Sequence, residues 1–192
     1  MTSFPNKYLP FDYEAYDNSG CTVIAALTNI ETGKCEYLPV TSEDKSWQTV
    51  IASCALPLLF QPIKINGKLY MDGGITDSIP FQKALDDGCE KLIVIITRER
   101  SYEKEVEPAI GISSFLYRKY PEFKKALENR TKMYNDAHHR LLELEKSGRI
   151  ILIAPEEDTS DWKRTERDPA KIQKMYDIGY NTTMKYKEKI IG

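Results

Sequence analysis

The sequence has no long apolar run and no export signal at its start. No stretch approaches the roughly 18 consecutive apolar residues that a membrane-spanning helix needs. The first ten residues, MTSFPNKYLP, lack a basic segment followed by an apolar one, which is the pattern of a signal peptide. We therefore expect a cytoplasmic protein that does not cross a membrane.

An excess of basic residues is also missing. The chain has 27 Lys and Arg residues against 29 Asp and Glu residues, which gives a net charge of -2. Nucleic-acid-binding domains normally carry a basic face, so we expect no nucleic-acid partner. The content of 41% hydrophobic and 29% charged residues is ordinary for a soluble globular protein, and 192 residues fit one domain.

Cysteine and histidine are scarce, and neither is arranged for metal binding or for catalysis. The four cysteines form no Cys-x-x-Cys pair, so we interpret them as reduced thiols of a cytosolic protein. The two histidines, His138 and His139, are neighbours in a strongly helical stretch. Adjacent residues of a helix point about 100° apart, so the pair is poorly placed to act on one ligand. With only these two histidines in the sequence, we expect no histidine-based catalytic triad.

The pattern of apolar residues predicts an α/β protein. The run KLIVIIT at 91–97 is apolar and β-branched, and we expect it to be a central strand. Asn66-Gly67 marks the turn of a β-hairpin within 63–71. Further strands are predicted at 21–30, buried on both faces, and at 35–40 and 149–154; helices are predicted at 46–55, 80–87 and 121–146, and from Asp168-Pro169 onward.

Two neighbouring segments stand out. The first is ASCALPLLFQP at 52–62, and the second is YMDGGITDSIP at 70–80. Taken alone, Asp-Gly-Gly is most simply a turn. Here, however, Asp72 follows directly on a hairpin strand, where loops commonly present catalytic groups. Gly73 and Gly74 leave room beside the carboxylate and permit unusual backbone angles.

Together the two segments resemble the patatin-like phospholipase family. That family has an A-S-x-A-x-P-x-x-F-x-P stretch shortly before a D-G-G or D-G-A box that runs on to a proline. The residues that match are Ala52, Ser53, Ala55, Pro57, Phe60 and Pro62 in the first segment, and Asp72, Gly73, Gly74 and Pro80 in the second. The order and the spacing of the two boxes both agree with the family.

The resemblance implies a lipid acyl hydrolase with a Ser-Asp dyad and no cofactor or metal. The serine attacks the ester carbonyl, and Asp72 takes its proton as general base. Gly73 and Gly74 support the motif. The implied fold is a three-layer α/β fold with a mainly parallel sheet flanked by helices. The implied partners are a lipid or small ester substrate and a transient membrane-surface contact, with the oligomeric state left open.

The sequence departs from the family in one important respect. No serine has glycine two positions before it and two positions after it, and no glycine-rich run is present to supply an oxyanion hole. We therefore interpret 1–192 as the C-terminal part of a patatin-like hydrolase domain, lacking its N-terminal part and inactive alone. The alternative is a non-enzymatic α/β module in which Asp-Gly-Gly is a structural turn.

Three nearby features have a catalytic or lipid-binding interpretation and a simpler one. Ser53 is expected to lie near the C-terminal end of a helix rather than to act as a nucleophile. Asp77 is expected to help cap the helix that begins near Pro80 rather than to be a second catalytic carboxylate. The stretch 115–120, FLYRKY, mixes aromatic and basic residues that suit a lipid surface, but ordinary packing is favoured.

Overall fold

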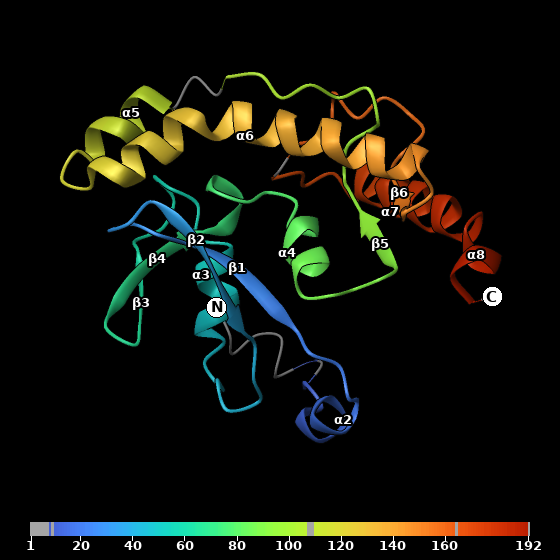
Figure 1. Cartoon of the computed structure of the whole chain (residues 1–192), viewed down its shortest axis with the longest axis horizontal. Helices are drawn as coiled ribbons and strands as arrows, with labels where there is room; N and C mark the ends of the chain where they lie inside the picture. Colours follow the sequence, from blue (N-terminus) through green and yellow to red (C-terminus); the bar gives the residue numbers. More distant parts are fainter. Residues whose placement is uncertain (1–7, 9, 107–109, 164, 192) are drawn as a thin grey trace. The chain divides into compact units, whose positions relative to one another are not determined.

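A computed structural model describes residues 8, 10–106, 110–163 and 165–191 (Figure 1). These residues form two compact units. The first contains the described chain up to Ser78 together with Val106–Met133, and the second contains Ile79–Glu105 and the described chain from Tyr134 onward. The long helix α6, Pro121–Lys146, contributes its first half to one unit and its second half to the other.

The first unit contains a four-stranded antiparallel sheet in the order β2-β1-β4-β3. Asn66 and Gly67 connect the two strands at one edge, with φ angles of 49° and 84°, as the predicted type I′ hairpin requires. The strands are β1 (Ile24–Asn29), β2 (Lys34–Pro39), β3 (Ile63–Ile65) and β4 (Lys68–Asp72).

Short helices and the first half of α6 accompany the sheet in this unit. The helices are α2 (Tyr13–Asn18), α3 (Gln48–Ser53), the 3-10 helix η1 (Gly73–Ile75) and α5 (Ile110–Leu116). Phe123 and Leu127 of α6 pack with Met71 at the end of β4 and Ile75 of η1 in one buried cluster. Met71 and Ile75, which flank Asp72 in the chain, are therefore core residues.

The second unit contains a two-stranded parallel sheet, β5 (Leu92–Ile95) with β6 (Ile150–Ile153). Its helices are α4 (Phe81–Asp86), the second half of α6, α7 (Pro169–Met184) and α8 (Lys187–Ile191). The side chains of Leu92 and Val94 in β5 are buried with Leu141 of α6 and Leu152 of β6. Asp168 caps α7 by accepting a hydrogen bond from the Ala170 amide at 2.9 Å, as predicted.

The mainly parallel sheet that the sequence predicted is not confirmed. The larger sheet is antiparallel because short connections join β1 to β2 and β3 to β4, and a parallel pair needs a long crossover. Among the strands of the described residues, only β5 and β6, which are separated by α5 and α6 in the chain, are parallel. A mixed α/β architecture is nevertheless what the structure shows.

Two strand predictions need correction. Within the described residues β5 pairs only with β6, and its outward side chains Ile93 and Ile95 are 48% and 69% exposed, so it is not a central strand. β1 is buried only in its second half, from Leu27 onward. By contrast, α6 has the bounds that the apolar stripe predicted. None of the helices in the described residues is long and apolar enough to cross a membrane.

Candidate active site

Asp72 lies at the end of β4, where its backbone is held from two sides. Its amide donates a hydrogen bond to the carbonyl oxygen of Ala55 at 3.0 Å. Its own carbonyl accepts one from the hydroxyl of Thr28, a fully buried residue of β1, at 2.8 Å. The bond to Ala55 joins the two sequence segments that carry the family resemblance, so the structure brings them together at Asp72.

The carboxylate of Asp72 is fixed by the turn that follows it. Oδ1 accepts a hydrogen bond from the Gly74 amide at 2.7 Å, which makes Asp72 the N-cap of η1. The residue is only partly exposed. A carboxylate held in this way keeps one orientation, because rotation about its side-chain bonds would break the bond to Gly74.

The two glycines are required by space rather than by backbone angle. A Cβ at Gly73 would lie 2.1 Å from the carbonyl oxygen of Ala26, so no other residue fits against β1 there. A Cβ at Gly74 would lie 3.0 Å from Oδ1 of Asp72. Neither glycine has a positive φ, so the turn does not use the positive-φ freedom that glycine permits. The role of the two glycines in supporting the motif stays a prediction.

Arg130 of α6 is a site residue that the sequence analysis missed. Its Nε donates a hydrogen bond to the carbonyl oxygen of Gly74 at 3.0 Å, and the hydroxyl of Ser78 donates to the same oxygen at 2.6 Å. Gly74 therefore contacts Asp72 through its N–H and is itself held through its C=O. The available signal was position: Arg130 follows Leu127 by three residues, so a basic side chain continues the apolar stripe of the helix.

Ser53 and Cys54 lie at the end of α3. Ser53 is the last residue of this helix, in agreement with the structural interpretation of that serine. The pKa of the Cys54 thiol is raised, first by burial and then by the negative charge of Asp72. A raised pKa keeps the sulfur protonated, so Cys54 is poorly suited to act as a thiolate nucleophile.

Asp77 does not cap the following helix, which corrects the sequence prediction. The N-cap position of α4 is Pro80, and no side chain caps it. Asp77 instead accepts a hydrogen bond from the Tyr37 hydroxyl at 2.5 Å. The pKa of Tyr37 is raised, first by burial and then by this hydrogen bond, so the phenol stays protonated. Asp77 thus joins η1 to strand β2, and its part in the fold is structural.

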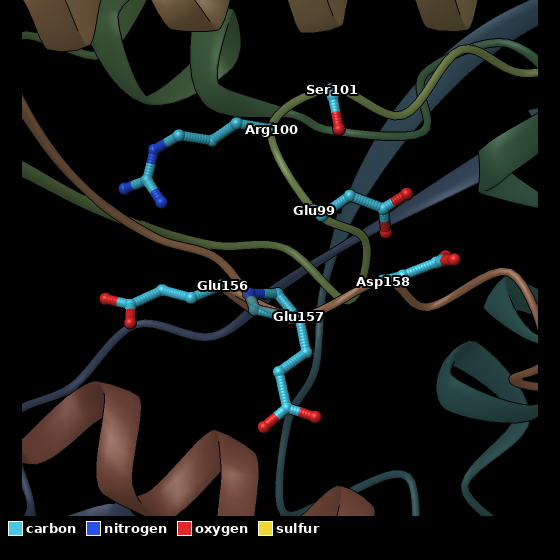
Figure 2. Close-up of a pocket in the computed structure, with 7 residues that line it drawn as sticks. Glu99, Arg100, Ser101, Glu156, Glu157 and Asp158 are labelled. Carbon is cyan, nitrogen blue, oxygen red and sulfur yellow. The ribbon is translucent and has the colours of Figure 1, made fainter.

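A concave region lies in the other unit, at the carboxyl ends of β5 and β6. It is a pocket of about 610 Å³ in which acidic side chains predominate (Figure 2). The lining residues are Glu99, Arg100, Ser101, Pro155, Glu156, Glu157 and Asp158. Ligands often bind at this end of parallel strands, so the position alone makes the pocket a candidate.

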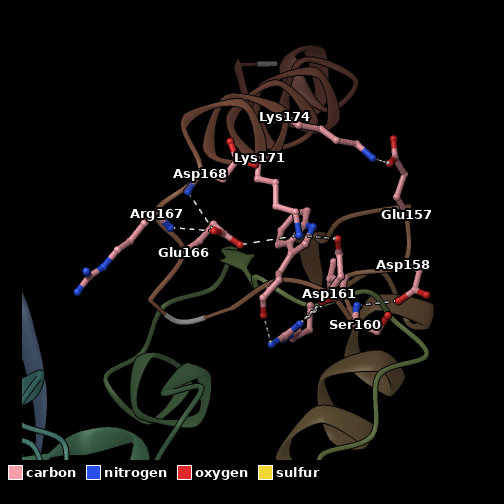
Figure 3. Close-up of polar contacts among 12 residues, drawn as sticks. Glu157, Asp158, Ser160, Asp161, Glu166, Arg167, Asp168, Lys171 and Lys174 are labelled. Carbon is pink, nitrogen blue, oxygen red and sulfur yellow. Dashed lines mark hydrogen bonds and ion pairs between the residues drawn. The ribbon is translucent and has the colours of Figure 1, made fainter.

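The acidic side chains of this pocket already have partners within their own unit. Glu157 pairs with Lys174 at 3.5 Å, and Asp158 accepts a hydrogen bond from the Ser160 amide at 2.7 Å (Figure 3). Glu156 pairs with Lys185 at 2.5 Å, and this contact lowers the pKa of its carboxyl group. No group of three or more side chains suited to a metal ion occurs in the described ranges. The acidic side chains of the pocket therefore form ion pairs and hydrogen bonds that stabilise the surrounding loops, and we do not interpret them as a catalytic arrangement.

Similar ion pairs and hydrogen bonds connect the loop after β6 with the start of α7. Lys171 lies between Asp161, at 3.4 Å, and Glu166, at 4.0 Å (Figure 3). Glu166 also accepts hydrogen bonds from the amides of Arg167 and Asp168. These contacts tie the loop after β6 to the first turn of α7.

The first unit thus has a mixed α/β architecture with a fixed aspartate at a strand end. Residues 15–85 match the family model described as patatin-like phospholipase. This segment is similar to that family, which confirms the resemblance that the two motifs indicated. The match supports a lipid hydrolase family in general.

A second family model matches the later part of the chain. Residues 120–191 match a domain of unknown function (DUF6363). This segment begins at the start of α6 and continues to the end of α8. No curated protein matches the chain.

Proposed function

We propose that Asp72 is the general base of a Ser-Asp dyad in a lipid acyl hydrolase that acts on phospholipid or small ester substrates. The observation that carries the proposal is the fixed carboxylate of Asp72 at the junction of the two motif segments. Its backbone amide donates a hydrogen bond to the Ala55 carbonyl, and its side chain accepts one from the Gly74 amide. The family match at residues 15–85 supports the same chemistry.

A carboxylate held in one orientation is suited to take the proton of a serine hydroxyl. A hydroxyl is a poor nucleophile until a positioned base takes its proton as it attacks the ester carbonyl. The Gly74 amide donates a hydrogen bond to Oδ1 of Asp72, which orients the carboxylate. Arg130 and Ser78 hold the Gly74 carbonyl, so the base is oriented before substrate arrives.

The serine and the oxyanion hole of this reaction would come from polypeptide outside the chain. No G-x-S-x-G sequence occurs among the 192 residues. We propose that the chain is the C-terminal part of a cytoplasmic patatin-like hydrolase that needs no cofactor or metal. By itself it would be inactive, because Asp72 would have no hydroxyl to activate.

The first test is direct labelling of the chain. The chain is incubated with a fluorophosphonate probe and with a short p-nitrophenyl ester. We expect neither stoichiometric labelling nor turnover, whereas a longer protein with a G-x-S-x-G segment should show both. Stoichiometric serine labelling with turnover by the chain alone would contradict the proposal, and Ser53 would be the first residue to replace.

A second candidate function is a non-enzymatic module in which Asp-Gly-Gly is a structural turn. One observation favours it: Oδ1 of Asp72 caps η1, which is a sufficient structural reason for an aspartate there. The two functions differ in what replacing Asp72 does to turnover in a longer, active protein. A structural turn predicts loss of activity only in step with loss of folding.

A further inference from the structure

The short helix α5 exposes its apolar side chains and buries its polar ones, whereas an ordinary surface helix does the opposite. Ile112, Phe115 and Leu116 are 66%, 69% and 55% exposed. Their spacing of three and four residues places them on one face. The buried side of the helix carries Ser113 and Ser114. The apolar face therefore points to solvent, and it costs free energy unless something covers it.

Basic side chains border this apolar face. The guanidinium of Arg118 lies 4.7 Å from the centre of the Phe115 ring, and its Nη1 donates to the Phe115 carbonyl at 3.2 Å. Lys119 is exposed beside it. Farther along the chain, Lys124 pairs with Glu128 at 3.7 Å and Lys125 pairs with Glu122 at 2.7 Å. The positive charge beside the apolar face therefore comes from Arg118 and Lys119, although the whole chain has a net charge of -2.

The residues after α5 are anchored, so the face is presented in a defined way. Tyr117 and Phe123 are buried, and their rings meet edge to face with centroids 4.9 Å apart. Tyr117 also donates its amide to the carbonyl of Ser113 at 3.0 Å. The sequence prediction of ordinary packing for 115–120 is therefore correct for Tyr117 and wrong for Phe115 and Leu116.

We propose that α5 docks this unit on an anionic lipid surface. The docking face consists of Ile112, Phe115 and Leu116, with Arg118 and Lys119 at its border. Aromatic and aliphatic side chains of an interfacial helix enter the boundary between headgroups and acyl chains, and basic side chains beside them attract anionic headgroups. The local positive charge, in a chain that is acidic overall, is complementary to such a surface. If the chain is part of a lipid hydrolase, docking would deliver lipid substrate, and this use rests on the proposed function. The docking itself does not rest on it.

The docking is tested by co-sedimentation of the chain with vesicles. One set is phosphatidylcholine alone, and the other is phosphatidylcholine mixed with phosphatidylserine. We expect the chain to bind the mixed vesicles more tightly, and added salt to weaken the binding because exposed charges are screened. No binding to the mixed vesicles at low salt would overturn the proposal.

Matched variants assign the binding to the face. Phe115→Ser with Leu116→Ser, and separately Arg118→Gln with Lys119→Gln, should each weaken binding to mixed vesicles by roughly tenfold or more. Tyr176→Ser, and Lys187→Gln with Lys189→Gln, remove similarly exposed residues of the other unit and should leave binding unchanged. Thermal midpoints show that each variant is folded. Equal weakening by the control variants would overturn the assignment.

Two further outcomes separate this inference from its alternatives. Asp72→Asn should bind vesicles as the unchanged chain does, so a failure of the dyad is distinguishable from a failure of docking. Light scattering without lipid tests for a protein contact instead. Self-association that Phe115→Ser with Leu116→Ser abolishes would assign the face to a second copy of the chain and overturn the lipid proposal.

Discussion

The Nε of Arg130 donates a hydrogen bond to the carbonyl oxygen of Gly74 at 3.0 Å, joining residues 56 positions apart in the sequence. The same residue, Gly74, donates its N–H to Oδ1 of Asp72. A side chain of α6 thus supports the turn that orients the candidate base. Arg130 would act through Gly74 rather than on the substrate, as a positioning residue.

Replacing Arg130 should weaken this turn. Arg130→Met removes the donor to the Gly74 carbonyl, and a hydrogen bond made by a charged group contributes about 1.5–3 kcal/mol. We expect a loss of this size in the free energy of unfolding, measured by urea denaturation. Lys124→Gln, at an exposed position on the same helix, is the control and should change stability by less than about 0.5 kcal/mol. An unchanged midpoint for Arg130→Met would show that the contact does not support the turn.

Glycine substitutions at two positions should have opposite effects. Gly73→Ala places a methyl group against the Ala26 carbonyl and should cost about 3 kcal/mol or more, since both backbones must move. Gly179→Ala lies within α7 with no atom near its Cβ position, and should stabilise by about 0.5–1 kcal/mol. Thermal midpoints of the two variants test the pair. A tolerated Gly73→Ala would contradict the close approach of η1 to β1.

Asp72→Asn separates chemistry from folding. The two side chains are nearly isosteric, and asparagine also caps helices, so the thermal midpoint should change little. In a longer protein that contains the nucleophile, loss of the general base should lower turnover by about 10²–10⁴-fold. Ester hydrolysis and thermal midpoint are measured on the same samples. Near-normal turnover, or a loss that only follows unfolding, would favour the structural turn.

Asp77→Asn is the matched control for that experiment. Its amide oxygen still accepts the hydrogen bond from Tyr37, so the contact loses its charge but not its acceptor. We expect a stability change of about 1 kcal/mol and little change in turnover. A turnover loss as large as that of Asp72→Asn would instead make Asp77 a second catalytic carboxylate.

His138 should make the chain sensitive to mild acid. Its side chain is 1% exposed, so a charge on its ring would be poorly solvated. Burial lowers the pKa of His138 below its ordinary value of 6.5, and this effect exceeds the opposite effect of the negative charge of Glu103. The unfolded chain therefore binds a proton more readily, so stability should fall as the pH drops below about 6.5 and stop falling below the folded-state pKa.

His138→Leu tests this pH dependence. The substitution replaces the buried ring by an apolar side chain, so the free energy of unfolding above pH 7 should stay within about 1.5 kcal/mol of the original value. The fall in stability below pH 6.5 should become smaller. His139→Gln is the control, since His139 is exposed and pairs with Glu103. The fall should persist in that variant.

The local features of this protein could be predicted from its sequence because neighbouring residues determine them. Asn66-Gly67 tolerates the positive φ angles of the hairpin turn, and Asp168-Pro169 supplies a cap and a first helical residue. The apolar stripe of α6 specifies a helix over 121–146 through its period. Asp72 could be placed at a strand end for the same reason: the hairpin before it is local.

The tertiary structure decided the features that depend on which distant segments meet. The order β2-β1-β4-β3, the contact of Arg130 with Gly74 and that of Tyr37 with Asp77 each join residues far apart in the chain. The residues next to Asp77 are compatible with a helix cap and with a hydrogen bond from a distant side chain. The fold places Tyr37 of β2 beside Asp77, so the carboxylate accepts from the Tyr37 hydroxyl. The sequence by itself determined which residues surround Asp72 along the chain; only the fold determined which side chains hold it in place.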